Sequence, residues 1–198
     1  MNVSVPAWLY QDQYFSKQFC DDLVNYCDNH LELKSASVGH DPNVELDTTG
    51  VRSSITGWLQ DRNDYEKSVK QEVYNLFHSW NQSFNFELTN IYDMQYTVYP
   101  AEDKGYYNWH VDSWYGSNGS NEDRKLSLSI QLSDPSDYQG GEFETEDSFT
   151  AIPSNEIRNR GTAIMFPSYI RHRVLPVTKG VRKSLVVWIE GPNWKWKN

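Results

Sequence analysis

The chain has 198 residues, a formal net charge of −9 at pH 7 and 15% aromatic residues. This length suits one domain with a substantial core, and the aromatic content favours a β-rich fold. The acidic charge argues against a nucleic-acid partner, because phosphate contacts require a basic surface. A membrane partner is not expected either, since no apolar stretch approaches the ~18 residues that span a bilayer.

The chain contains two cysteines, Cys20 and Cys27. On a helix they would lie about 10 Å apart along the axis, which is too far for a disulfide. Residues 1–6 have neither the basic region nor the apolar run of a signal peptide. We therefore expect a cytoplasmic protein, because a chain without structural disulfides fits a reducing compartment.

In chain order, the first part of the sequence predicts two helices. Apolar residues that recur every three to four positions predict one helix over about 16–30, with Ser16 as its N-cap, and a second over about 65–82. Between them, residues 39–50 have the composition of a loop, and residues 51–59 predict a strand.

From residue 84 onward the apolar period changes to two, which predicts a run of strands. In one of them, leucine and isoleucine alternate with Ser127, Ser129 and Gln131. The apolar set would pack against a helix or a second sheet, and the polar set would line a pocket. The predicted strands are 86–99, 125–133, 142–145, 162–166, 171–177 and 182–190.

Helices followed by strands favour an α+β, mainly β fold, with the N-terminal helices packed on one sheet. We expect a single domain over residues 1–198. Its helical support would cover about 1–85, and its jelly-roll core about 86–192.

Three residues form a candidate metal site. His110 and Asp112 would share one face of a strand, because alternate side chains point the same way. His172 adds a second imidazole on an apolar stretch. Two histidines and one carboxylate on one flank of a metal suit a non-haem Fe(II) oxygenase. The alternative is a histidine and an aspartate that only form hydrogen bonds on a strand.

A candidate anion site follows on the last predicted strand. Arg182, ten residues after His172, shares one face of that strand with Ser184. An inward-facing arginine is costly unless an anion meets it, and a guanidinium fork beside a hydroxyl suits a carboxylate. The alternative for Arg182 is a surface salt bridge.

In order and spacing, several segments between about Gln95 and Trp188 resemble the Fe(II)- and 2-oxoglutarate-dependent dioxygenases. The similarity is greatest to the prolyl-4-hydroxylase-like branch, which includes the PKHD-type hydroxylases. A weaker similarity covers residues 51–59. The segments that carry the main resemblance are Trp109-His-Val-Asp112, Leu126 to Pro135, Gly140-Gly-Glu-Phe143, Gly161 to Pro167, His172 to Val177 and Gly180-Val-Arg-Lys-Ser184.

The resemblance implies a double-stranded β-helix with the metal at its open end. His110, Asp112 and His172 would then ligate Fe(II), and the remaining positions would take 2-oxoglutarate and O2. The far carboxylate of 2-oxoglutarate would meet Arg182 and Ser184. In this family a tyrosine on the preceding strand often helps to hold the cosubstrate. Tyr99 is the best match for that tyrosine and Tyr96 the second, although either residue could belong to the core.

The same branch favours hydroxylation of a prolyl residue in a peptide or protein. A free amino acid or other small molecule is the alternative substrate, and a non-catalytic jelly-roll binding or structural module is the alternative of another class. The net charge would favour a peptide that carries Lys or Arg. Residues 113–121 would form a lid or only a crossover. The candidate substrate contacts are Trp109, Trp114, Tyr115, Tyr107 and Arg52.

Overall fold

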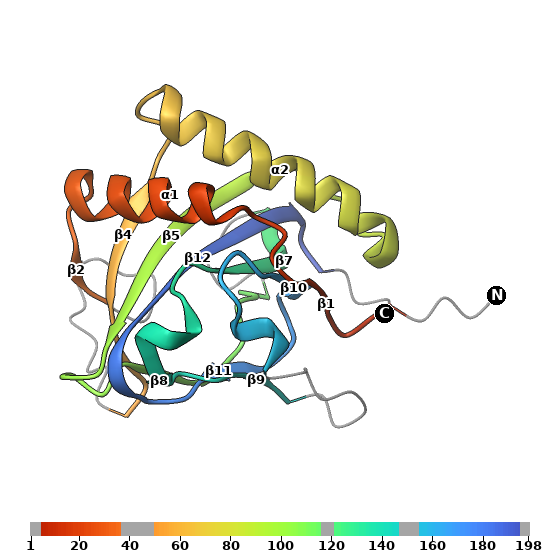
Figure 1. Ribbon diagram of the computed structural model, residues 1–198. Coiled ribbons are helices and arrows are strands. Elements are labelled where there is room, and N and C mark those ends of the chain that lie inside the picture. Colours follow the sequence, from red (N-terminus) through yellow and green to blue (C-terminus); the bar gives the residue numbers. More distant parts are fainter. Residues whose placement is uncertain (1–4, 37–49, 116–120, 147–154, 195–198) are drawn as a thin grey trace.

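The computed structural model describes residues 5–36, 50–115, 121–146 and 155–194. Two helices lie over one face of a large antiparallel sheet, and a smaller antiparallel sheet faces the other side (Figure 1). This two-sheet arrangement with the helices on one side confirms the predicted mainly β fold. Most of the expected loop at 39–50 and the centre of the 113–121 segment lie outside the described residues.

The two helices begin where side chains cap their free backbone N–H groups. Helix α1 (Lys17–His30) follows Ser16, whose hydroxyl accepts a hydrogen bond from the Phe19 N–H at 3.1 Å. Helix α2 (Asp64–Phe84) follows Asn63, whose side chain accepts from Glu66 N–H at 3.0 Å. Both helices match their predicted positions to within two residues. Neither of these helices is long and apolar enough to cross a membrane.

The strands form a large and a small antiparallel sheet. Across the large sheet the strands follow the order β1 (Leu9–Gln11), β10 (Ala163–Pro167), β7 (Glu122–Gln131), β12 (Val177–Pro192), β5 (Ile91–Pro100), β4 (Ile55–Leu59) and β2 (Lys34–Ser35), with β8 (Tyr138–Gly140) paired to the start of β12. Across the small sheet the order is β3 (Arg52–Ser53), β6 (Tyr106–His110), β11 (His172–Val174) and β9 (Phe143–Thr145). Short 3-10 helices cover Pro135–Asp137 and Glu156–Arg158.

Several predicted strands have different limits in the structure, and two of these differences have a clear local cause. Strand β5 begins at Ile91 rather than at residue 86, because the side chain of Asn81 takes both backbone groups of Phe86: its amide donates to the Phe86 carbonyl at 2.8 Å and its oxygen accepts from the Phe86 N–H at 3.0 Å. The run predicted over 171–177 divides before Pro176, which has no N–H for a sheet ladder. The chain then continues as the long strand β12.

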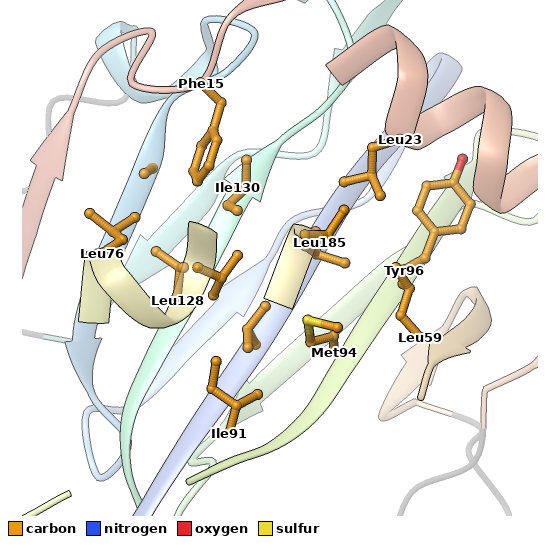
Figure 2. Packing of buried hydrophobic residues seen from close by; sticks show 14 of the residues in the cluster. Phe15, Leu23, Leu59, Leu76, Ile91, Met94, Tyr96, Leu128, Ile130 and Leu185 are labelled. Carbon is orange, nitrogen blue, oxygen red and sulfur yellow. The ribbon is translucent and has the colours of Figure 1, made fainter. Parts of the chain in front are cut away.

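The main core lies between the helices and the large sheet. Figure 2 shows Leu23 of α1 and Leu76 of α2 over Leu128 and Ile130 of β7 and Leu185 of β12. Each fully buried side chain of this type contributes about 1.5–3 kcal/mol. The apolar side chains of β7 therefore face the helices as predicted, and its serines face the other sheet.

The cysteines are part of this core. Cys20 and Cys27 are both fully buried and neither forms a disulfide, as predicted.

Candidate metal centre and adjoining cavity

The small sheet brings the two predicted imidazoles together. His110 on β6 and His172 on β11 are direct partners in the antiparallel ladder, and their ring centres lie 4.1 Å apart. Asp112 follows two residues after His110. Its Oδ1 lies 3.7 Å from His110 Nε2 and its Oδ2 lies 3.6 Å from His172 Nε2. The three candidate ligand atoms thus lie within 4.8 Å of one another, close enough to hold one metal ion.

Backbone carbonyls fix the orientation of both imidazoles. The Nδ1 of His110 lies 2.7 Å from the carbonyl oxygen of Asn108, and the Nδ1 of His172 lies 3.0 Å from that of Ile170. A carbonyl only accepts hydrogen bonds, so each Nδ1 must carry the proton. Each Nε2 then presents its lone pair toward Asp112, which is the tautomer that a metal ligand requires.

Two serines hold the carboxylate in place. The Ser127 hydroxyl donates to Asp112 Oδ2 at 2.7 Å, and the Ser127 and Ser168 hydroxyls lie 2.9 Å apart. The Asp112 N–H also donates to the Ser168 carbonyl at 2.9 Å. The alternation along β7 pointed to Ser127 as a pocket residue. Ser168 follows a different strand, and no sequence pattern connected it to Asp112.

The protonation states also suit a divalent cation. Burial, together with the nearby His172, lowers the pKa of His110 to about 3. Burial alone would raise the pKa of Asp112, but His172, His110, Arg124 and the Ser127 hydrogen bond outweigh it and lower that pKa. At neutral pH the cluster therefore offers a neutral His110 imidazole beside a carboxylate, and metal binding requires ligands in these unprotonated states.

A cavity of about 320 Å³ lies beside the cluster and is lined by all three of its residues. Arg182, Ser184, Val186 and Trp188 line it along one face of β12. Six residues of extended strand separate Arg182 from Trp188, or roughly 20 Å. The cavity therefore has an end at Arg182 and another end at Trp188.

At the first end, Arg182 is a buried cation with unused donors. The residue is only 1% exposed, and its Nε and Nη1 have no hydrogen-bond partner among the described residues. The Ser184 hydroxyl beside it also has no hydrogen-bond partner among the described residues. Gly141, at φ +67°, gives Arg182 its space, because a β-carbon there would lie 2.9 Å from Arg182 Cδ. These unsatisfied donors suit the carboxylate of a ligand.

The two candidate tyrosines lie on opposite faces of β5. Tyr99 lines the cavity beside Arg182. Tyr96 faces the helices instead, and its hydroxyl donates to Asp28 Oδ1 at 2.7 Å. Tyr99 is therefore the tyrosine placed to meet a ligand at the Arg182 end.

Three of the five expected substrate contacts line the cavity, namely Arg52, Tyr107 and Trp114. Trp109 and Tyr115 do not, which corrects the sequence-based expectation. An irregularity in the β6–β11 ladder between Tyr107 and His110 lets both of these residues face the cavity, with their rings stacked. Trp109 points away and packs under Arg173, whose guanidinium carbon lies 4.5 Å from the ring centre. Tyr115 is 51% exposed.

Arg124 also lines the cavity, although the sequence did not indicate it. Its position relative to Leu126 predicts that both face the helices. In the structure the ladder between β7 and β12 is irregular at this point: Leu126 pairs with Ile189, and the next pair is Arg124 with Glu190. This bulge turns Arg124 toward the cavity.

Comparisons with known proteins agree with this geometry. Residues 94–190 match the sequence model of the 2OG-Fe(II) oxygenase superfamily. A PKHD-type hydroxylase of Synechococcus sp. (strain CC9311) is 30% identical over 131 residues, which is 64% of this chain and 57% of that relative. This chain thus spans less than two thirds of that relative's length.

Solved structures show the same fold at low sequence identity. A prolyl-4-hydroxylase of Pseudomonas putida has a TM-score of 0.70 at 19% identity, covering 93% of both chains. A prolyl hydroxylase from Trichoplax adhaerens, in complex with a peptide fragment of the hypoxia inducible factor oxygen degradation domain, has a TM-score of 0.65 at 17% identity, covering 92% of this chain and 83% of that one. The family match over residues 94–190 and the His-Asp-His cluster, on a fold shared with these structures, support the assignment of the chain to the 2OG-Fe(II) oxygenase superfamily.

Proposed function

We propose that this protein is an Fe(II)- and 2-oxoglutarate-dependent dioxygenase that hydroxylates an unactivated C–H bond. The observation that carries the proposal is one cavity that contains both the His110, Asp112 and His172 cluster and the guanidinium of Arg182, whose Nε and Nη1 have no partner among the described residues. A non-catalytic module of the same fold has no need for a preformed metal cluster and a buried anion site in the same cavity.

In this proposal the Nε2 atoms of His110 and His172 and one carboxylate oxygen of Asp112 hold Fe(II). All three residues line the cavity, so a metal held by them would be accessible to ligands from the cavity. When bound, Fe(II) with 2-oxoglutarate and O2 supplies the oxidation that places oxygen on a C–H bond, while 2-oxoglutarate becomes succinate and CO2. The serine pair Ser127 and Ser168 keeps the carboxylate in position.

Arg182 binds the distal carboxylate of 2-oxoglutarate, and Ser184 adds a hydroxyl. The guanidinium fork suits a carboxylate, and the burial of the site excludes competing water. Tyr99 covers the guanidinium of Arg182 and borders the same ligand. These residues orient the cosubstrate so that its other end reaches the metal cluster.

For the substrate we propose a prolyl residue in a peptide or protein. The similarity to prolyl hydroxylase structures and to PKHD-type hydroxylases supports this choice, and a free amino acid or other small molecule is the alternative. We also propose that residues 1–198 act as one domain in the cytoplasm. Two free, buried cysteines support a reducing compartment, where structural disulfides are rare.

The test is anaerobic titration of the purified protein with Fe(II), or with Mn(II) in its place, followed by 2-oxoglutarate. We expect one metal ion per chain, 2-oxoglutarate binding that requires the metal, and succinate release when O2 is admitted. The double variant His110→Ala/His172→Ala should lose metal binding. His78→Ala, at an exposed histidine on α2, is the matched control. Stoichiometric metal binding by the double variant would contradict the proposal.

A further inference from the structure

The end of the cavity away from Arg182 contains two more buried arginines, Arg52 and Arg124. They are 8% and 7% exposed and come from opposite sheets, β3 and β7. Neither is needed to hold the metal or the distal carboxylate of 2-oxoglutarate. Two buried guanidinium groups in a substrate cavity need a separate explanation, because burying a cation is costly unless an anion meets it.

Arg52 has only neutral hydrogen-bond partners among the described residues. Its Nε donates to the Ser54 hydroxyl at 2.6 Å and its Nη2 donates to Gln95 Oε1 at 2.9 Å. Its guanidinium carbon lies 4.5 Å from the centre of the Tyr107 ring. No carboxylate of the described chain forms a salt bridge with Arg52. These contacts hold the guanidinium in one orientation without neutralising it.

Arg124 lies between two indole rings. Its guanidinium carbon is 3.9 Å from the centre of the Trp188 ring and 4.6 Å from that of Trp114. The Nε of Arg124 and the indole N–H of Trp188 have no hydrogen-bond partner in the described residues. Its nearest ion pair, from Nη2 to Asp93 Oδ2, is 3.6 Å long, which exceeds a direct hydrogen bond. Arg124 is therefore oriented by the rings, with donors left for a ligand.

The position of β5 puts the two arginines within reach of one group. Arg52 binds Gln95 and Arg124 pairs with Asp93, and these two partners are alternate residues on one face of β5. Alternate residues of a strand lie about 7 Å apart. A single carboxylate between the two guanidinium groups can therefore contact both, or contact one and neutralise the other.

The charges of the loaded cavity point to the same ligand. Fe(II) and doubly charged 2-oxoglutarate cancel each other. Among the residues that line the cavity, the three arginines exceed the two carboxylates, Asp93 and Asp112, by one positive charge. Glu190 pairs with Arg124 in the ladder but does not line the cavity. Its neutralising effect is partial, because burial beside Glu122 raises its pKa to about 7. One further negative charge, supplied by a ligand, would bring the net charge of the loaded cavity to zero.

We propose that the substrate carries a carboxylate that binds between Arg52 and Arg124, while Trp58, Trp188 and Tyr107 hold its apolar part. This inference rests on the proposed hydroxylase function and narrows its substrate class. It reverses the preference for a basic peptide that the net charge of −9 suggested, because the charge around the binding site, rather than that of the whole surface, decides which substrate is desolvated there. The rings of Trp58 and Trp188, 6.3 Å apart, form the apolar wall.

The carboxylate can belong to a small molecule or to an acidic side chain of a peptide, and matched probes separate the two. The first pair is N-acetyl-L-proline and N-acetyl-L-prolinamide, and a second pair uses leucine in place of proline. A third pair consists of blocked peptides that differ only by Glu or Gln beside a proline. Binding is measured by tryptophan fluorescence on anaerobic protein already loaded with Mn(II) and 2-oxoglutarate.

We expect the acid member of at least one pair to bind about tenfold more tightly than its neutral partner, as charge-assisted hydrogen bonds predict. This ratio should fall toward one in Arg52→Gln and in Arg124→Gln, and Arg52→Lys should retain part of it. Arg171→Gln is the matched control, because Arg171 is a 47% exposed arginine paired with Glu146 outside the cavity.

The tighter binding of the acid probe over its neutral partner must also depend on Arg52 and Arg124. Equal binding of acid and neutral probes by the unsubstituted protein, or the full ratio in folded Arg52→Gln, would overturn the inference. Failure of the protein to load Mn(II) and 2-oxoglutarate is a separate result, which contradicts the proposed function itself. Preference in the N-acetyl amino acid pairs alone identifies a small molecule, and preference in the peptide pair alone identifies an acidic peptide.

Discussion

Tyr99 and Arg182 lie directly opposite each other on the antiparallel strands β5 and β12, and the guanidinium carbon of Arg182 is 5.2 Å from the centre of the Tyr99 ring. The pair closes the end of the cavity in which Nε and Nη1 of Arg182 have no partner among the described residues. An aromatic face against a guanidinium fixes its plane at little cost in entropy. The pair therefore presents a rigid fork to the ligand.

Replacing this fork by a single ammonium group should weaken cosubstrate binding. In Arg182→Lys we expect the Kd for 2-oxoglutarate, measured by anaerobic calorimetry with Mn(II), to rise about tenfold or more, because bidentate contact is lost. Metal stoichiometry should stay at one. Lys183→Arg is the control, since Lys183 pairs with Asp28 at 2.6 Å outside the cavity. An unchanged Kd in Arg182→Lys would remove Arg182 from the site.

The opposite orientations of the two tyrosines on β5 allow a comparison of the same substitution on the two faces of one strand. Tyr99→Phe should weaken 2-oxoglutarate binding severalfold, because it removes the hydroxyl beside the ligand, with little change in thermal stability. Tyr96→Phe removes the hydrogen bond to Asp28 and should lower the free energy of unfolding by about 1 kcal/mol, with ligand binding intact. Calorimetry and thermal denaturation separate the two effects, and the reverse pattern would exchange their roles.

The hydrogen bond from Ser127 to Asp112 should contribute to metal affinity. Ser127→Ala removes the hydrogen bond that holds the Asp112 carboxylate in place. Loss of such a supporting contact typically costs about 10–100-fold in metal affinity. Competition with a metal-binding dye measures the effect. Ser129→Ala, on the same face of β7, removes a hydroxyl that is not bonded to Asp112 and should change affinity far less. Equal affinities in the two variants would show that Ser127 does not position the carboxylate.

Glu190 should make the folded state sensitive to pH. Burial beside Glu122 raises its pKa from 4.5 to about 7 in the folded protein. Between these two values the folded state binds more protons than the unfolded state, so this group lowers the free energy of unfolding as the pH rises. Its stabilising contribution is complete below pH 4.5 and is lost as the pH rises through about 7.

Glu190→Gln should therefore stabilise the protein at pH 8 by ~1–3 kcal/mol and by much less at pH 5. Chemical denaturation at both pH values measures the difference. Glu146→Gln, at a half-exposed surface carboxylate, serves as the control for the loss of a carboxylate as such. A Glu190→Gln effect that is the same at both pH values would contradict the shifted pKa.

The sequence by itself predicted both helices, the mainly β fold and the residue types of the candidate site. The spacing of apolar residues located both helices, because a helix must bury one stripe, and the alternation around Leu128 and Ile130 assigned the two faces of β7. The residue types at 110, 112 and 172 indicated a metal, because two imidazoles and a carboxylate in a buried setting have few other uses. Arg182 and Ser184 followed from their positions on one strand face.

Only the tertiary structure decided which neighbouring side chains reach the cavity. The rule of alternate faces holds within an unbroken strand, and a single bulge reverses it. Irregular pairing between β6 and β11 brings Tyr107 to the same side as His110, whereas alternation from His110 alone turns Trp109 away. A second irregularity between β7 and β12 brings Arg124 inward. Bulges arise from the pairing of two strands that are distant in sequence, so the pattern within one strand does not reveal them.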